Sequence, residues 1–246
     1  MTDLELALEL ADLADLISLD RYLASDLVVE SKPDLTPVSD ADKAVENEIR
    51  LQLAKVAADD GIIGEEFESS SSTNNREWIL DPIDGTKNFI RGVPVWATLI
   101  ALRVNGVITV GVVSSPALGR RWYASAAAGA FVIETVGGSK KVRRLAVSKV
   151  SKVSDASFAH SEIVKKDIWE GDYDNFLKLS NDVWRTRGFG DFWSYMLVAE
   201  GAVDFAIEPK LALWDMAALS VIVTEAGGSF TNLAGIAGVS GPGAIA

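Results

Sequence analysis

The feature that most restricts the fold of this chain is a pair of β-rich segments joined by only two residues. Residues 97–104 and 107–113 are dominated by Ala, Leu, Ile and Val, and Asn105-Gly106 lies between them. Asn-Gly favours the type I′ turn, whose twist matches that of a tight β-hairpin. A second hairpin is predicted between residues 121–123 and 130–133. The sequence therefore predicts an antiparallel sheet in the first half of the chain.

Two amphipathic helices are predicted before this sheet. The first runs to about residue 22, and its apolar residues recur at helical spacing: Leu6, Leu10, Leu13 and Ile17. The second begins at Ser39 or Asp40, either of which can cap it. Its apolar stripe consists of Val45, Ile49, Leu53 and Val56. Asp42 falls near this stripe, and a buried carboxylate needs a partner, for which metal-bound water is one candidate.

The second half of the chain alternates predicted strands and helices. Strands are expected at residues 156–159 and 203–207. Helices are expected at residues 174–181, 192–200 and 214–225. Gly201 and Gly227 stand where C-terminal caps of the last two helices belong. We therefore expect an α+β half at residues 1–145 and an α/β half at residues 146–246, packed as one compact unit.

Residue composition excludes several kinds of site. The chain has no Cys and one His, which excludes disulfides, thiolate nucleophiles, zinc–thiolate sites and His-rich metal sites. A metal ion would have to be held mainly by oxygen atoms. Oxygen ligands are typical of hard ions such as Mg²⁺, Mn²⁺ and Ca²⁺.

Charge and hydropathy restrict the partners of the chain. Its formal net charge of -12 would repel a nucleic-acid backbone, and the short basic run at residues 140–144 is expected to be a solvated strand edge or loop. The sequence lacks an apolar run long enough to span a membrane, and its first residues lack the pattern of a signal peptide. We therefore expect a soluble cytoplasmic protein with neither a nucleic-acid nor a membrane partner.

Acidic residues occur in three places where a strand is predicted to end or a helix to begin. Residues 81–86 read Asp-Pro-Ile-Asp-Gly-Thr and follow a predicted strand. Glu65 follows a short apolar segment, and Asp215 lies at the start of the last predicted helix. Each motif alone is more typical of a turn, a loop or a helix cap. Together they predict carboxylates around paired divalent ions, which neutralise a phosphate ester and generate the attacking hydroxide.

The residues after Asp84 are expected to begin a helix or a tight turn. Free backbone N–H groups at such a position can cradle a phosphate. Gly85 would let the backbone approach this phosphate closely, because it has no side chain.

These motifs resemble those of one protein family. The sequence reads Gly-Glu-Glu at residues 64–66, Trp-Ile-Leu-Asp-Pro-Ile-Asp-Gly-Thr-Lys-Asn-Phe at residues 78–89, Trp-Asp-Met-Ala-Ala at residues 214–218 and Thr-Glu-Ala-Gly-Gly at residues 224–228. The pattern is similar to that of the inositol monophosphatase family of Mg²⁺-dependent, lithium-sensitive phosphatases. The resemblance implies a layered α-β-α-β-α sandwich of the inositol monophosphatase/fructose-bisphosphatase type. It also implies a small phosphorylated substrate and a homodimer.

The resemblance implies a metal site with two or three Mg²⁺ ions, with Mn²⁺ as an alternative. Glu65, Asp81 and the Ile83 carbonyl would hold the first ion. Asp81, Asp84 and Asp215 would hold the second.

The remaining implied roles concern the attacking water and the phosphate. Thr86, with Asp42 behind it, would orient and help to deprotonate metal-bound water, so Asp42, Thr86 and Glu65 are the expected catalytic residues. The amides of Gly85 and Thr86 would receive the phosphate.

A narrower resemblance concerns the substrate. Residues 187–195 and 200–204 are similar to those of the bacterial histidinol-phosphate phosphatases of this superfamily. L-Histidinol phosphate carries an ammonium group, with which Asp191 and Glu208 would pair. Arg187 would either reach the substrate or pair with a neighbouring carboxylate. Inositol phosphatases commonly carry a His three residues before the Trp-Asp aspartate, where this chain has Ala212.

The leading hypothesis is thus a Mg²⁺-dependent phosphomonoesterase that hydrolyses L-histidinol phosphate in histidine biosynthesis. The alternative substrates are inositol 1-phosphate and a broader set of small phosphorylated metabolites. An alternative of another class is a metal-binding regulatory protein without turnover, which the intact acidic set disfavours. Family members usually continue through a final strand and helix beyond the position of residues 241–246, so we expect either a short chain or the loss of part of the natural one.

Overall fold

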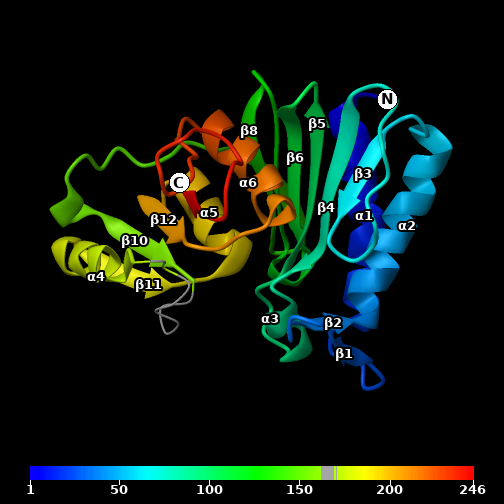
Figure 1. Ribbon diagram of the computed structural model, residues 1–246, viewed down its shortest axis with the longest axis horizontal. Coiled ribbons are helices and arrows are strands. Elements are labelled where there is room, and N and C mark those ends of the chain that lie inside the picture. Colours follow the sequence, from blue (N-terminus) through cyan, green and yellow to red (C-terminus); the bar gives the residue numbers. More distant parts are fainter. Residues whose placement is uncertain (162–168, 170) are drawn as a thin grey trace.

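The computed structural model of the chain describes residues 1–161, 169 and 171–246, and Figure 1 shows its layers. The helices are α1 (Asp3–Arg21), α2 (Asp40–Val56), α3 (Thr86–Ile90), α4 (Tyr173–Asp182), α5 (Asp191–Ala199) and α6 (Leu213–Glu225). The strands are β1 (Val29–Ser31), β2 (Pro37–Ser39), β3 (Gly61–Gly64), β4 (Arg76–Asp84), β5 (Ala97–Val104), β6 (Val107–Ser115), β7 (Arg120–Ser125), β8 (Gly129–Val136), β9 (Ser139–Arg144), β10 (Ser157–His160), β11 (Arg185–Gly188), β12 (Phe205–Glu208) and β13 (Ala244–Ile245).

The elements form five layers. Helices α1 and α2 cover one face of a seven-stranded sheet, and α5 and α6 cover its other face. Beyond α5 lies a four-stranded sheet, whose outer face packs against α4. The predicted α-β-α-β-α sandwich is therefore confirmed.

The seven-stranded sheet has the order β3-β4-β5-β6-β7-β8-β9. Only β3 and β4 run parallel, and the other neighbours are antiparallel. The predicted hairpin joins β5 and β6, with Val104 opposite Val107. Asn105 and Gly106 both have positive φ, at 50° and 84°, as a type I′ turn requires. The second predicted hairpin is also confirmed, between β7 and β8.

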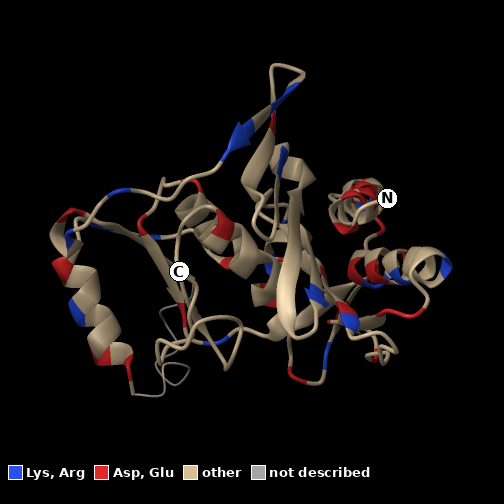
Figure 2. Ribbon diagram, turned by 90° about the horizontal axis from the view of Figure 1, so that it is seen from above, with Lys and Arg blue, Asp and Glu red and all other residues tan. Residues whose placement is uncertain are grey.

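The basic run at residues 140–144 lies in β9, which is exposed along its whole length and forms an edge of this sheet. Figure 2 shows the blue Lys and Arg positions of this strand on a protruding part of the ribbon. Lysines on an edge strand oppose pairing with a second sheet. The prediction of a solvated strand edge is therefore confirmed.

Helix α2 buries the predicted stripe at Val45, Ile49 and Leu53. The prediction is wrong for Val56, the last residue of the helix, which is 46% exposed. In α1 the buried face differs from the prediction, because Leu13 and Ile17 are only partly buried. Small residues let this helix approach α2 closely, and the buried apolar residues are Leu6, Ala7, Leu10, Ala11 and Ala14.

Strand β4 differs from the prediction that it ends at Asp81. It continues to Asp84, with a bulge against β5 between these two residues. Pro82 has no N–H to give to the ladder. Its carbonyl oxygen accepts a hydrogen bond from a side chain, Thr98 Oγ1, at 2.8 Å. A bulge turns side chains away from the regular alternation of a strand, and here it lies between the two acidic residues of the motif.

The four-stranded sheet has the order β11-β10-β12-β13. Its two inner strands and the helices α4, α5 and α6 match the predicted elements to within two residues. The largest apolar cluster crosses both predicted halves, since Ile79 and Leu99 belong to the same cluster as Phe192 and Met216. Among the described residues, no helix is long and apolar enough to cross a lipid bilayer.

Candidate active site

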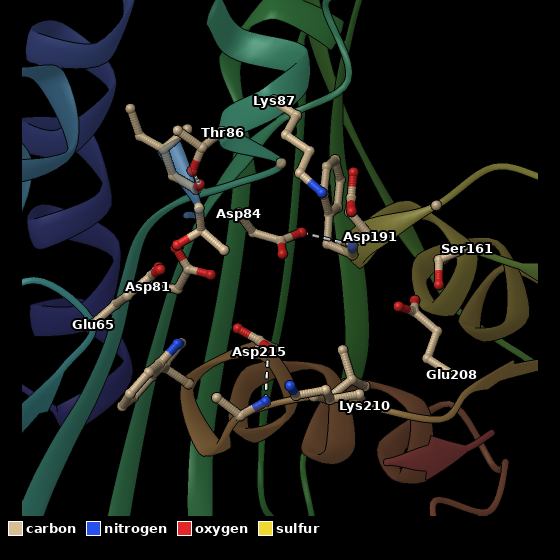
Figure 3. Close-up of a pocket in the computed structure, with 18 of the residues that line it drawn as sticks. Glu65, Asp81, Asp84, Thr86, Lys87, Ser161, Asp191, Glu208, Lys210 and Asp215 are labelled. Atoms are coloured by element: carbon tan, nitrogen blue, oxygen red, sulfur yellow. Dashed lines mark hydrogen bonds between the residues drawn. The ribbon is translucent and has the colours of Figure 1, made fainter. Parts of the chain in front are cut away.

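A pocket of about 950 Å³ lies where the ends of β4, α3, α5 and α6 meet, and Figure 3 shows the residues that face it. Most of the residues predicted for the site line this pocket. They are Glu65, Asp81, Ile83, Asp84, Gly85, Thr86, Asp191, Glu208 and Asp215. Residues more than 120 positions apart in the sequence therefore meet in one cavity.

Three of the predicted metal ligands form a compact cluster. Each of Asp81, Asp84 and Asp215 offers a carboxylate oxygen, and these oxygens lie within 4.8 Å of one another. Asp81 and Asp84 are placed by the bulge in β4, and Asp215 stands in the first turn of α6. Like charges at this separation repel strongly unless a cation lies between them.

Backbone N–H groups fix two of these carboxylates. The N–H of Phe192, at the start of α5, donates to Asp84 Oδ2 at 2.7 Å. The N–H of Ala212 donates to Asp215 Oδ2 at 2.7 Å, as in a capping box. Each carboxylate keeps its other oxygen for a ligand.

Burial and mutual repulsion raise the pKa of every member of the cluster. Burial, with the neighbouring charges, holds the pKa values of Asp81 and Asp84 well above their usual range. Burial raises the pKa of Asp215 to about 7, although the Ala212 N–H opposes the shift. Without a cation, the folded protein therefore favours protonated carboxyl groups at this cluster.

The donor set fits a hard divalent cation. Asp81 is 2% exposed, and its Oδ1 has no hydrogen-bond partner among the described residues. A buried oxygen of this kind loses its hydration without compensation unless a ligand occupies the site. Carboxylate and carbonyl oxygens are the ligands that Mg²⁺, Mn²⁺ and Ca²⁺ prefer.

Glu65 lines the pocket but does not join the cluster of three. Lys32 Nζ lies 2.6 Å from Glu65 Oε1 and 2.7 Å from Glu66 Oε1. Burial opposes the charge of Lys32, but the hydrogen bonds to the two glutamates outweigh it and raise the pKa of the ammonium group. Lys32 thus forms an ion pair with Glu65, whose carboxylate the family resemblance assigns to the first metal.

Thr86 and Asp42 form a second polar group beside the cluster. Thr86 Oγ1 lies 3.2 Å from Asp42 Oδ1 and 3.0 Å from the Ile83 carbonyl oxygen. Asp42 is fully buried, and its other oxygen accepts from Ser39 N–H at 2.8 Å. Burial raises the pKa of Asp42, although the Ser39 hydrogen bonds oppose the shift. The predicted partnership of Thr86 and Asp42 is present in the geometry.

Gly85 is the N-cap of α3 and has a φ of 85°. A methyl group there would lie 3.0 Å from the Val95 carbonyl oxygen and 3.3 Å from Asp191 Oδ2. Positive φ and close packing both require glycine at this position. The segment that begins at Gly85 lines the pocket, as the predicted phosphate site requires.

Asp191 and Glu208 lie on the other side of the pocket (Figure 3). Asn88 Nδ2 donates to Asp191 Oδ2 at 3.1 Å, which fixes a residue with an unusual φ of 49°. Glu208 is 5% exposed, and its Oε1 has no hydrogen-bond partner among the described residues. Burial raises the pKa of Glu208 to about 8. A cation bound there would restore the charge of this carboxyl group.

The structure does not bring Arg187 to the pocket. Its side chain is exposed, and its guanidinium group donates to the Thr186 carbonyl at 2.7 Å. Among the described residues, Arg187 has no contact that links it to the other predicted site residues. Its assignment to the substrate stays a prediction.

Sequence reasoning assigned no side-chain role to several polar residues that line the pocket, among them Lys87, Asn88, Ser161 and Lys210. The positions of Lys87 and Asn88 could have been predicted, because both fall in the first turn of the helix that the sequence predicts after Asp84. Ser161 and Lys210 follow the ends of two parallel strands, β10 and β12. The carboxyl ends of parallel strands are where ligands commonly bind.

The cluster of three acids predicts how stability depends on pH and metal. A carboxyl group whose pKa is raised in the folded state stabilises the fold fully below its unfolded pKa of about 3.9 and loses this contribution as the pH rises through the folded value. For Asp215 that value is about 7. A divalent cation offsets the repulsion only when the carboxylates are ionised. We therefore expect Mg²⁺ to raise Tm more at pH 8 than at pH 5.

Differential scanning fluorimetry measures this difference. The protein is heated at each pH with EDTA or with Mg²⁺ at roughly 100 times its dissociation constant for the protein. The comparison at each pH cancels the titration of acids elsewhere in the chain. An equal Mg²⁺-induced shift at both pH values would contradict the assignment of the three acids.

Comparisons with known proteins agree with this geometry. The model of the inositol monophosphatase family matches residues 3–242. A protein of Mycobacterium tuberculosis named histidinol-phosphatase is 52% identical over 246 residues, which cover 99% of this chain and 92% of that protein. A protein of the same name from Streptomyces coelicolor is 55% identical over 241 residues, which cover 96% of this chain and 88% of that protein.

Solved structures give the same result at lower identity. The extragenic suppressor protein suhB of Bartonella henselae superposes with a TM-score of 0.85 at 28% identity, covering 98% of this chain and 92% of that one. The IMPase of Thermotoga maritima also has a TM-score of 0.85 at 28% identity, with 100% and 91% coverage. Sequence motifs, layered fold and acidic pocket point the same way, and the chain belongs to the inositol monophosphatase family.

Proposed function

We propose that this protein hydrolyses L-histidinol phosphate to L-histidinol and phosphate, with Mg²⁺ as its metal. The observation that carries the choice of substrate is the buried Glu208 carboxyl group, which lines the pocket together with Asp191 and whose Oε1 has no hydrogen-bond partner among the described residues. Two acids at this end suit the ammonium group of histidinol phosphate better than the uncharged hydroxyl groups of an inositol ring. The names of the two similar bacterial proteins support the same substrate.

The metal chemistry would be that of the family. Asp81, Asp84 and Asp215 would hold divalent ions, with Glu65 and the Ile83 carbonyl as further ligands. When bound, two or three such ions would neutralise phosphate charge, lower the pKa of a water molecule and stabilise the leaving oxygen. Glu65 would have to exchange its ion pair with Lys32 for this role.

Thr86 and Asp42 would handle the proton of the attacking water. When Thr86 Oγ1 donates to Asp42, the Thr86 lone pairs can accept a hydrogen bond from water and orient its oxygen. A proton that leaves this water can pass to Thr86 Oγ1 while the Thr86 proton passes to Asp42. The raised pKa of Asp42 makes its carboxylate a better proton acceptor than an exposed aspartate.

The backbone of α3 would place the phosphate. Gly85 and Thr86 line the pocket beside Asp84, and their backbone N–H groups would bind a phosphate oxygen. Asp191, which is hydrogen-bonded to Asn88 of α3, and Glu208 would hold the substrate ammonium.

Phosphate release from L-histidinol phosphate and myo-inositol 1-phosphate, measured side by side with and without Mg²⁺, tests the proposed function. We expect release to require a divalent cation. Because the buried Glu208 Oε1 gains no cationic partner when inositol phosphate binds, we expect kcat/KM to favour histidinol phosphate at least about 100-fold.

Glu208→Gln is the matching variant, since it removes the charge and keeps the shape. It should raise KM for histidinol phosphate and leave slow hydrolysis of inositol phosphate unchanged. A wild-type preference for inositol phosphate would overturn the substrate and keep the metal site. No release from either ester at any pH would favour the metal-binding regulatory alternative.

Three further parts of the proposal concern the setting of the enzyme. Mn²⁺ is expected to replace Mg²⁺ because both are hard ions with similar ligands. We propose that the protein works in the cytoplasm, where small phosphorylated metabolites are found, and as a homodimer. Size-exclusion chromatography with light scattering would measure the assembly directly.

A further inference from the structure

Helix α2 carries a second buried carboxylate, Glu46, one turn after Asp42. Its side chain is fully buried, and residues four apart lie on the same face of a helix. Asp42 contacts Thr86, whereas Glu46 faces the loop that follows β3. One face of α2 therefore touches two separate parts of the active site.

The Glu46 carboxylate is hydrogen-bonded to the backbone that follows Glu65 and packs against the residue that precedes it. Its Oε2 accepts from the Glu66 N–H at 2.8 Å, and its Oε1 accepts from the Phe67 N–H at 3.3 Å. A methyl group at Gly64 would lie only 2.0 Å from Oε1, so the carboxylate packs directly on the Gly64 Cα. These contacts leave little freedom for the backbone that carries Glu65.

Arg50 completes the arrangement from the next turn of α2. Its Nε donates to Glu46 Oε1 at 2.8 Å, and its Nη2 donates to the Phe67 carbonyl at 3.3 Å. The guanidinium group compensates the charge of Glu46, which is costly to bury alone. Arg50 and Glu46 together hold the peptide from Gly64 to Phe67 against α2.

We propose that Glu46 is a positioning residue for the metal site, which holds Glu65 where its carboxylate can bind a cation. This inference rests on the proposed metal-dependent function. Glu46 does not line the pocket, so it would act through the loop and not by contact with the metal or the substrate. Residues that orient metal ligands commonly change metal affinity about 10–100-fold when they are replaced.

Glu46→Gln should disturb this arrangement because both carboxylate oxygens accept hydrogen bonds. The amide nitrogen of Gln would face either the Glu66 N–H or the Arg50 guanidinium group, and each is a donor. One of the bonds that fix the loop would be lost. We expect the dissociation constant for Mn²⁺, measured by isothermal titration calorimetry, to rise about 10–100-fold.

Gly64→Ala tests the same idea without removing the charge. The added methyl group meets the end of a flexible side chain, so the carboxylate can move away while the backbone of β3 stays in place. We expect weaker Mn²⁺ binding here too. If Glu46→Gln does not fold, this variant supplies the test.

Glu77→Gln is the matched control. Glu77 pairs with Arg103 at 2.8 Å on β4, outside the pocket, so its replacement should leave the Mn²⁺ dissociation constant unchanged. At saturating Mg²⁺, Glu46→Gln should regain much of the wild-type kcat. Replacement of a residue that only stabilises the fold would not change the Mg²⁺ concentration that the enzyme needs for half-maximal activity. Folded Glu46→Gln or Gly64→Ala protein that binds Mn²⁺ like the wild type would overturn the inference. Failure of the wild type to bind Mn²⁺ would instead refute the proposed function.

Discussion

Asp84→Asn is expected to lower kcat by more than about 100-fold, because even replacement of groups that only orient metal ligands costs about 10–100-fold. The change removes one negative charge from the cluster of three acids and adds almost no volume. Asn can still accept the Phe192 N–H through its side-chain oxygen. The metal-free fold should therefore be retained, and its Tm at pH 8 should rise, since one buried like charge is gone. Steady-state phosphate release and scanning fluorimetry measure the two effects.

Asp60→Asn is the control with the opposite pattern. Asp60 is also buried, but it lies outside the pocket and accepts from Trp78 Nε1 at 2.9 Å and from Arg76 Nε at 3.2 Å. Its loss should lower Tm and leave kcat unchanged. An Asp84→Asn enzyme with near-normal kcat would refute the assignment of Asp84 as a metal ligand.

Thr86→Ala is expected to lower kcat by about 10²–10⁴-fold, the range that positioned proton-transfer groups commonly contribute. The variant loses the hydroxyl group that donates to Asp42 and that we propose to orient the attacking water. KM should change little, since the methyl group does not block the pocket. Thr86→Ser keeps the hydroxyl group and should keep most of the rate. Measured kcat and KM for the three proteins give the comparison.

The double variant Thr86→Ala/Asp42→Asn separates proton transfer from packing. If the two residues act in one path, the double variant should be about as slow as the slower single variant, because residues that act as a unit are not additive. Fully multiplicative losses would show that Thr86 and Asp42 act independently. A Thr86→Ala enzyme with near-normal kcat would remove Thr86 from the proposed reaction.

Much of the fold could be predicted where local and global signals agree. The Asn105-Gly106 turn and the alternation of apolar residues around it specify the central hairpin without help from the rest of the chain. The ends of α5 and α6 were marked in the same way by glycine, since Gly201 and Gly227 both have positive φ directly after the helices. Short strands such as β11 and β13 were not predicted, because their pairing partners lie far away in the sequence and decide their conformation. Strand β1 pairs with the nearby β2 but is exposed along its whole length, so it carries no apolar pattern.

The acidic pocket could be predicted because three separate motifs carried the same chemistry. The ion pair of Lys32 with Glu65 could not, because it depends on how the β1–β2 hairpin folds over the loop after β3. The bulge at Asp81 and Asp84 was likewise hidden. Pro82 signalled an interruption of the ladder, but the sequence did not reveal that the strand resumes beyond it. Arg187 shows the reverse case, in which a sequence resemblance named a residue that the structure places on the surface.

The separation of Asp81 and Asp84 from Asp215 along the chain has a consequence for synthesis of the protein. Because a ribosome adds residues in order, a nascent chain that ends before residue 215 lacks one member of the cluster. Metal that binds the three acids together can therefore favour only the completed fold, and it does so by mass action on the whole chain. The same ions that would serve the reaction would also distinguish a finished polypeptide from an unfinished one.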